Sequence, residues 1–277
     1  MSSKFNSRRN KKSSAPVEPT ANLDWHEEEI LIIVKTYPSI STKYQETVCI
    51  AGITSDGNWI RLYPLKYRYL PFSKQFKKYQ WVKALVKKCG IRDTRKESYR
   101  IKEDSIRLGS FINTKKRWSE RKSIVLPTVS KSLEEIKDNY DIDKTSLGIF
   151  RPKTIDFKAK AENAEWKPTQ KGQLTQLKLF GSQPKKLERI PFKFVYEFTC
   201  ADKRCEGHKL SIHDWEIMQL YRGVRDTYDY AQDKILEKIK QKFLYEMWDK
   251  SKDSHLIVGS VYPKKTFIVV GVFWPPK

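Results

Sequence analysis

Two of the chain's four cysteines and two of its four histidines lie within fourteen consecutive positions, in the pattern C-x4-C-x2-H-x4-H. Thiolate and imidazole groups gathered this densely are typical of a site that holds a borderline-soft metal ion with four near-tetrahedral ligands. The sequence therefore predicts a structural zinc site with the ligands Cys200, Cys205, His208 and His213. Asp214 is the alternative fourth ligand. The competing interpretation is a pair of buried, small apolar cysteines beside a histidine that serves the start of a helix.

The chain is also strongly basic. Its 277 residues include 55 Lys and Arg against 33 Asp and Glu, which gives a net charge of +22. Such a field attracts polyanions, and nucleic acid is the partner it favours most. No apolar run approaches the ~18 residues of a membrane-spanning helix. No secretory signal follows the start, and four cysteines without paired spacing do not indicate a disulfide scaffold.

Composition divides the chain into four segments. Residues 1–22 form a basic arm with too few apolar residues to fold. Residues 23–157 contain short β-branched and aromatic runs separated by turn residues, which predicts a small β-barrel or a highly curved sheet. Residues 158–190 are a flexible linker, rich in Lys, Gln, Gly and Pro. Residues 191–277 predict a strand, the Cys/His loop, two helices and a hairpin, so the expected fold class is α+β.

The cations concentrate in the predicted β-rich domain. Between Arg61 and Lys122 the chain has twenty Lys and Arg but five Asp and Glu, interleaved with tyrosines, tryptophans and phenylalanines. Cations that bind phosphates and rings that stack on bases are the composition of a nucleic-acid groove. The alternative is a barrel whose rings are core and whose lysines are solvated. The candidate nucleic-acid contacts are Arg61, Tyr63, Lys66, Tyr67, Arg68, Lys77, Lys78, Lys87, Arg95, Arg100 and Arg117.

One pentapeptide in the predicted linker, Gln176-Leu177-Lys178-Leu179-Phe180, resembles the peptide by which many bacterial DNA-processing proteins bind the replicative sliding clamp. The resemblance implies that Leu179 and Phe180 enter an apolar pocket of the clamp while Gln176 makes polar contacts. Leu177 completes the motif, whereas Lys178 departs from the small or acidic residue preferred at that position. The alternative is a short apolar segment that packs on a neighbouring domain.

The motif Cys-x4-Cys-x2-His-x4-His-Asp-Trp-Glu and the terminal Gly-Val-Phe-Trp-Pro-Pro resemble a family of uncharacterised bacterial proteins. The Trp-Ile-Arg-Leu-Tyr-Pro stretch that begins at Trp59 fits the same resemblance, which therefore spans most of the chain. It implies no activity and supplies no catalytic residues. With the charge, it leads us to expect a cytoplasmic, nucleoid-associated protein.

The leading hypothesis is an accessory protein that binds nucleic acid, DNA in preference to RNA. Genome maintenance, a mobile element and phage defence are the expected settings. No Gly-rich phosphate loop, nucleophile triad or deaminase motif is present in the sequence. One alternative is a metal-dependent nuclease in which Asp214 and Glu216 hold the catalytic ion; another is an RNA-binding factor. The simpler roles are a helix cap for Asp214 and an ion pair for Glu216. The acidic residues of the helix expected at 131–142 are assigned to its surface, without chemistry.

Overall fold

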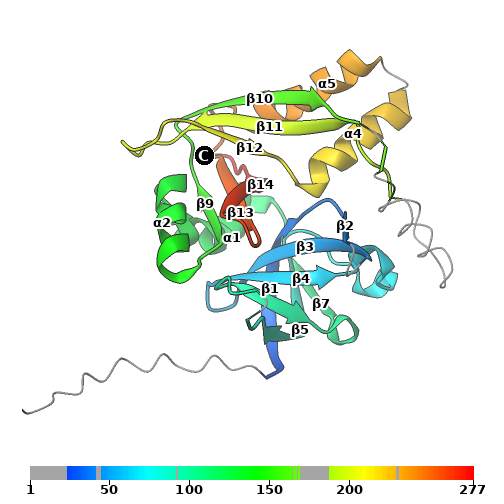
Figure 1. Cartoon of the computed structure of the whole chain (residues 1–277), viewed down its shortest axis with the longest axis vertical. Helices are drawn as coiled ribbons and strands as arrows, with labels where there is room; N and C mark the ends of the chain where they lie inside the picture. Colours follow the sequence, from blue (N-terminus) through cyan, green and yellow to red (C-terminus); the bar gives the residue numbers. More distant parts are fainter. Residues whose placement is uncertain are drawn as a thin grey trace, which may run out of the picture.

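The computed structural model describes residues 24–41, 45–91, 93–163, 165–166, 168, 187–228 and 231–277. The fold is α+β, as the sequence predicts, with a β-barrel in the N-terminal half and two further sheets in the C-terminal half (Figure 1). The predicted basic arm and the pentapeptide Gln176–Phe180 lie outside the described residues. None of the helices within the described residues has the length and apolar character needed to cross a membrane.

Five strands close the barrel in the order β1-β3-β4-β6-β5, and β5 pairs back onto β1. All of these pairings are antiparallel except that of β4 with β6. Two further strands extend the sheet, β2 beside β3 and β7 beside β5. The bounds are β1 His26–Lys35, β2 Ser39–Ser41, β3 Gln45–Thr54, β4 Trp59–Leu65, β5 Gln80–Lys88, β6 Ser98–Ile101 and β7 Arg107–Phe111.

Strand β1 is the element that joins the two halves. Its residues Ile30–Val34 are all buried, because both faces of the strand meet a core. Ile30 and Ile32 belong to the core inside the barrel. Leu31 and Ile33 belong to a second core outside the barrel wall, which also contains residues of the C-terminal half. A continuous β-branched run is what a strand buried on both faces requires.

The C-terminal half contains two sheets and most of the helices (Figure 1). One sheet has the order β14-β13-β9-β8 and the other β10-β11-β12. The strands are β8 Val129–Ser130, β9 Leu147–Phe150, β10 Thr154–Ala161, β11 Phe192–Thr199, β12 His208–Ser211, β13 His255–Val261 and β14 Thr266–Phe273. Helix α1, Lys115–Val125, precedes this half, whose helices are α2 Leu133–Asp143, α4 Trp215–Tyr228 and α5 Gln232–Lys240, the last continued by a π-helical turn at Gln241–Glu246.

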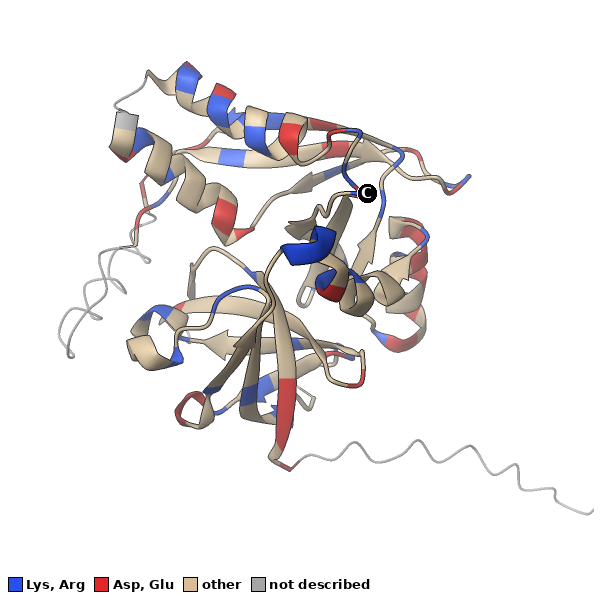
Figure 2. Ribbon diagram, turned by 180° about the vertical axis from the view of Figure 1, so that it is seen from behind, with Lys and Arg blue, Asp and Glu red and all other residues tan. Residues whose placement is uncertain are grey.

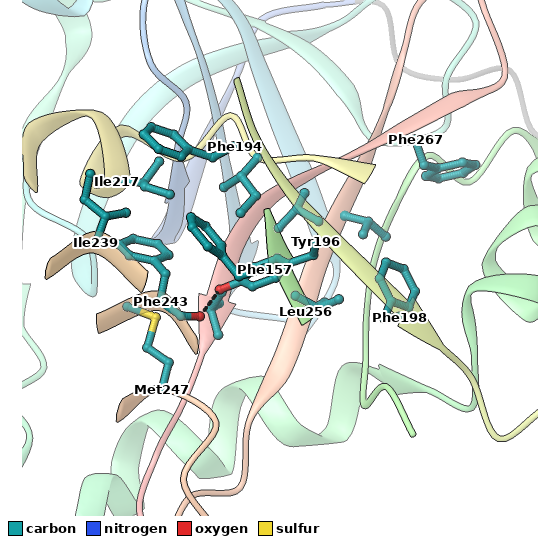
Figure 3. Close-up of a cluster of buried hydrophobic side chains, with 14 of the residues drawn as sticks. Phe157, Phe194, Tyr196, Phe198, Ile217, Ile239, Phe243, Met247, Leu256 and Phe267 are labelled. Carbon is teal, nitrogen blue, oxygen red and sulfur yellow. Dashed lines mark hydrogen bonds between the residues drawn. The ribbon is translucent and has the colours of Figure 1, made fainter. Parts of the chain in front are cut away.

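An aromatic cluster holds α4 and α5 against the sheet β10-β11-β12 (Figure 3). Rings from β10 and β11 meet the apolar stripe of α5 and its π-helical continuation, where Ile239, Phe243 and Met247 are buried. The hydroxyl of the buried Tyr196 donates to the Phe243 carbonyl. The repeat of apolar residues every four positions thus forms core, as its helical spacing predicts.

The division between the halves differs from the predicted one. Residues 129–157 were expected to belong to the N-terminal domain and residues 158–161 to the linker, but β9 pairs with β13 and β10 pairs with β11. These strands therefore belong to the C-terminal sheets. The segment carries little local signal for its partner, because the strands that it pairs with lie far along the chain.

Candidate functional site

Four side chains from two separate segments meet at the loop end of the β11–β12 hairpin. Cys200 and Cys205 lie in its loop, His208 begins β12, and Glu134 lies in the first turn of α2. Their candidate ligand atoms all fall within 4.8 Å of one another. The His208 Nε2 atom lies 2.5 Å from Glu134 Oε1 and 3.3 Å from the Cys205 sulfur. This metal cluster, as we call the four residues, could hold a metal ion.

The metal cluster has the properties expected of a cation site. Cys200 and Glu134 are buried, and the Glu134 Oε2 atom is buried without a hydrogen-bond partner. Burial, and then the neighbouring Glu134 carboxylate, raise the pKa of the Cys200 thiol to about 12. Among the described residues no Lys or Arg forms an ion pair with Glu134. A bound cation would satisfy the orphaned oxygen and stabilise both thiolates.

The predicted ligand set needs one correction. Cys200, Cys205 and His208 come together as predicted, but the fourth member is Glu134, which was assigned to the helix surface. His213 is exposed, and its ring shares a hydrogen bond with the Ser211 hydroxyl. The extended backbone after β12 turns this side chain away, since the His213 N–H and carbonyl pair with Val269 and Tyr37.

Several of the eleven candidate nucleic-acid contacts are structural groups. Arg61, Tyr67 and Arg95 are buried, with 4%, 6% and 6% of their surfaces exposed, and so cannot form a groove surface. Arg61 donates to the carbonyl and hydroxyl of Ser146 at 3.0 and 3.1 Å. Arg95 is paired with Asp93 and donates to the Ser260 carbonyl.

The remaining candidates are half-buried or exposed. Arg68 is half-buried and forms an ion pair with Glu46 at 2.8 Å. The Tyr63 hydroxyl lies 3.4 Å from that of Thr47, and Lys87 is half-buried. The candidates whose side chains are exposed are Lys66, Lys77, Arg100 and Arg117. The predicted groove is therefore not a single surface of the barrel.

A cavity of about 620 Å³ opens between the barrel and the C-terminal half, and we call it the junction pocket. Its aromatic lining consists of Tyr79, Phe111, Trp118, Trp215, Phe243 and Trp274. Its charged lining consists of Lys35, Lys77, Lys78, Arg121, Glu216 and Lys242. The volume falls within the range of roughly 300–1,000 Å³ that is common for small-molecule sites.

A network of charged side chains, in which Asp214 is buried and Glu216 is half-exposed, adjoins the junction pocket. Lys78 pairs with Asp214 at 3.2 Å and with Glu216 at 3.1 Å. Burial alone would lower the pKa of Lys78, but the two carboxylates raise it above its usual range. Burial raises the pKa of Asp214 to about 6, against the opposing effect of Lys78. Burial, followed by the Lys78 charge, lowers the pKa of Lys35 to about 8.

Asp214 also has a local structural role. Its Oδ1 atom accepts the backbone N–H of Glu216 at 3.0 Å and so caps the start of α4. The cap and the Lys78 ion pairs are the simpler roles that the sequence suggests for these two acids. Both carboxylates pair with the Lys78 ammonium group.

Arg121 is the least expected member of the junction pocket. It is 5% exposed, and its Nε and Nη2 atoms donate to the Ile112 carbonyl at 2.9 and 2.6 Å. The guanidinium lies 3.8 Å from the ring centre of Tyr79 and 4.8 Å from that of Trp118. No carboxylate of the described residues forms an ion pair with it. A buried, positively charged edge is thus available to a ligand.

The first turn of α1, Lys115–Arg117, carries exposed charge beside the pocket, and we call it the α1 loop because its backbone is not helical. Lys115, Lys116 and Arg117 are exposed, and they form a continuous blue turn at the start of α1 (Figure 2). The φ angles of Lys116, Arg117 and Trp118 are 49°, 56° and 62°. Left-handed backbone costs about 1–2 kcal/mol for each such residue. Trp118 packs against Phe273 and Trp274 and so holds the strained turn in place.

Residues 129–277 match the model of a family described as Domain of unknown function (DUF8757). The chain belongs to this family. Residues 26–127 match a second family model, described as Domain of unknown function (DUF8758). No curated protein matches the chain.

The junction pocket is built from both matched regions. Lys35, Lys78 and Arg121 come from the DUF8758 match, whereas Glu216 and Trp274 come from the DUF8757 match. The metal cluster lies wholly within the DUF8757 match. The pocket thus depends on the packing of one region against the other, and the metal cluster does not.

Sequence reasoning missed Glu134, Lys35 and Arg121 for different reasons. Glu134 occupies the first turn of a capped helix, where an acid is ordinary. Lys35 ends an apolar strand and Arg121 lies in a weakly amphipathic basic segment. The sequence does single out Lys35, because it is a cation directly after a run of apolar residues. For Glu134 and Arg121 the sequence gives no comparable sign of a place in the site.

Proposed function

We propose that the protein binds nucleic acid at the junction pocket and at the loop of Lys115–Arg117. The observation that carries the proposal is the pocket lining, in which five Lys and Arg and one Glu surround six aromatic rings. Cations that bind phosphates beside rings that stack on bases are the recurring means of binding single-stranded nucleic acid. DNA is the first polymer to test, and RNA the second.

Zn²⁺ is the ion that fits the metal cluster. Two sulfurs, one imidazole and one carboxylate are a ligand set for Zn²⁺, whereas Mg²⁺ and Ca²⁺ prefer oxygen ligands alone. Four protein ligands complete a tetrahedral ion and leave no position for a substrate. We therefore assign the ion a structural role, in which it fastens α2 to the β11–β12 loop.

The charge of the α1 loop can be tested by salt dependence. The variant K116S/R117S is expected to weaken binding to every polymer and to lower the slope of log affinity against log salt by about two, because two phosphate contacts are lost. Fluorescence anisotropy with a single strand, a duplex and an RNA of equal length, at several salt concentrations, measures both quantities.

The matched control is K160S/K203S, which removes two exposed lysines from β10 and the β11–β12 loop, segments that line no part of the junction pocket. An unchanged slope in K116S/R117S would contradict the proposed contact. The same samples with added Mg²⁺ or Mn²⁺ are run on a gel, and cleavage that is lost in Asp214→Ala would favour the nuclease instead.

The low pKa of Lys35 predicts a pH-dependent affinity. The charged groups that face it are Lys78, Asp214 and Glu216, and its ammonium donates to the Tyr67 hydroxyl. Because its pKa is about 8, Lys35 is mainly charged at pH 7 and mainly neutral at pH 9. We expect the affinity for a polyanion to fall about fivefold over this interval, as one charge-assisted contact is lost.

Lys35→Arg keeps its charge to higher pH and is expected to flatten the profile. Lys77→Arg, an exposed lysine of the same pocket, is the control and should keep the wild-type profile. Asp214 titrates below the interval, since its pKa is about 6. A wild-type affinity that is constant from pH 7 to 9 would remove Lys35 from the contact surface.

A further inference from the structure

The junction pocket is a better fit to a planar ring than to a backbone phosphate. Trp118 and Trp274 are half-buried, and their ring centres lie 5.7 Å apart in an edge-to-face arrangement. Phe111, which also lines the pocket, is 49% exposed. Lys242 and Lys252 lie over the Trp274 ring, and Arg121 lies over the rings of Trp118 and Phe111. The exposed parts of these rings beside the cavity are apolar surfaces that a ligand can cover. A flat aromatic ligand would cover them by stacking.

The polar groups inside the pocket match the edge of a heterocycle. Arg121 is 5% exposed, and the structure records no hydrogen bond from its Nη1 atom within the described part of the chain. A guanidinium edge of this kind pairs with two adjacent acceptors, such as O6 and N7 of guanine. Glu216, half-exposed on the opposing helix α4, can accept from a ring N–H or amino group.

The exposed cations of the α1 loop lie outside the pocket, where the phosphates of a nucleotide would remain if its base entered the pocket. Phe111, Trp118 and Arg121 line the cavity, while Lys115, Lys116 and Arg117, in the same segment, are exposed to solvent. A nucleotide that enters base first would therefore keep its two flanking phosphates at the exposed, basic part of the loop. This division of apolar interior and cationic exterior follows the division between base and backbone.

We infer that the junction pocket receives the base of one unpaired nucleotide within a nucleic-acid strand, with the Arg121 guanidinium on the acceptor edge of the base. This inference rests on the proposed function and adds the part of the polymer that is recognised. A paired base presents only its groove edge, because its faces are covered by its neighbours in the stack. The base must therefore lie outside the helix, in a bulge, a loop or a single strand, before it can enter.

The test compares two duplexes that have the same charge and length. Each contains one bulged position, which carries guanine in the first duplex and an abasic sugar in the second. We expect the guanine bulge to bind on the order of tenfold more tightly, because stacking and the Arg121 contact need the base. A third duplex, with 2-aminopurine at the bulge, should lose fluorescence on binding as its ring stacks on tryptophan.

The outcomes separate this inference from the proposed function. Equal affinity for both bulges would overturn the base pocket while leaving nucleic-acid binding intact. Binding to neither duplex, at low salt, would overturn both. A guanine preference supports both, and it should shrink to about twofold or less in Phe111→Ala, which removes one wall, and in Arg121→Lys, which removes the planar donor edge.

Comparison of the two variants shows whether a lost guanine preference results only from misfolding. Phe111 is half-exposed, so its replacement should leave the melting temperature nearly unchanged even if Arg121→Lys lowers it. Both variants should lose less affinity for the abasic bulge than for the guanine bulge, since the exposed basic loop is intact. A Phe111→Ala protein that keeps its melting temperature and the full guanine preference would overturn the assignment of this pocket.

Discussion

The substitution Cys205→Ala, or removal of the metal by a chelator, is expected to lower the melting temperature by about 10 °C or more. The metal cluster joins the first turn of α2 to the loop after β11, and these two segments are far apart in the sequence. Without the ion, the buried Glu134 carboxylate contacts His208 through Oε1 alone, and its Oε2 atom has no hydrogen-bond partner. Leaving a buried charge unpaired costs about 3–5 kcal/mol. Calorimetry of the zinc-loaded and chelated protein measures the shift.

The chain offers a matched control for this experiment. Cys89 is a half-buried thiol outside the metal cluster, so Cys89→Ala should keep one equivalent of zinc and nearly the wild-type melting temperature. The identity of the fourth ligand is tested by Glu134→Gln and His213→Ala. The first should weaken zinc binding and the second should not. Full zinc affinity in Glu134→Gln, or its loss in His213→Ala, would contradict the ligand set read from the geometry.

The contrast between these two residues explains how far the sequence could predict the metal cluster. Cys200, Cys205 and His208 are close in sequence, so their spacing alone brings them together. Glu134 and His208 are separated by 74 positions and meet only because α2 lies against the β11–β12 loop, which it also contacts through Asp138 and Arg204. A local pattern supplies the ligands of one loop, and the ligand that closes the site depends on tertiary packing. The nearer His213 was the wrong choice for this reason.

The basic segment Arg61–Lys122 shows what residue composition does not predict. Its charge count correctly marked a region rich in cations, but composition does not distinguish Arg61, in the core, from Arg117, in solvent. Strand alternation places successive side chains on opposite faces. In β4, however, the outward face is covered by the C-terminal half, so that both faces are buried. Knowledge of that contact is needed to recognise Arg61 as a structural residue.

Arg61→Met is the second substitution for which we expect a large loss of stability, about 3–5 kcal/mol, because it leaves a buried polar network without its cation. The Arg61 guanidinium reaches from β4 of the barrel to Ser146 at the start of β9. Glu97 accepts the backbone N–H groups of Ser146 and Leu147 at 2.7 and 3.2 Å. Chemical denaturation measures the free energy of unfolding.

Arg100→Met is the matched control, an exposed arginine on the neighbouring strand β6, and should change the free energy of unfolding by less than about 0.5 kcal/mol. The space for the Arg61 guanidinium depends on Gly259 of β13, since a Cβ at that position would lie 3.2 Å from its Nη2 atom. Gly259→Ala should therefore also be destabilising. Equal stability of the Arg61 and Arg100 variants would show that the network contributes little.

The same network links stability to the proposed function. Arg61, Glu97 and Ser146 line no part of the junction pocket, yet they fasten the barrel to the C-terminal half that completes it. Glu97→Gln keeps the shape of the side chain but loses its charge and one acceptor. Below the unfolding transition, this variant should retain binding through the exposed Lys115–Arg117 loop and lose part of the preference for a base-bearing bulge. The preference for a base-bearing bulge depends on the relative position of the two halves, whereas the salt-dependent phosphate contact depends on one loop.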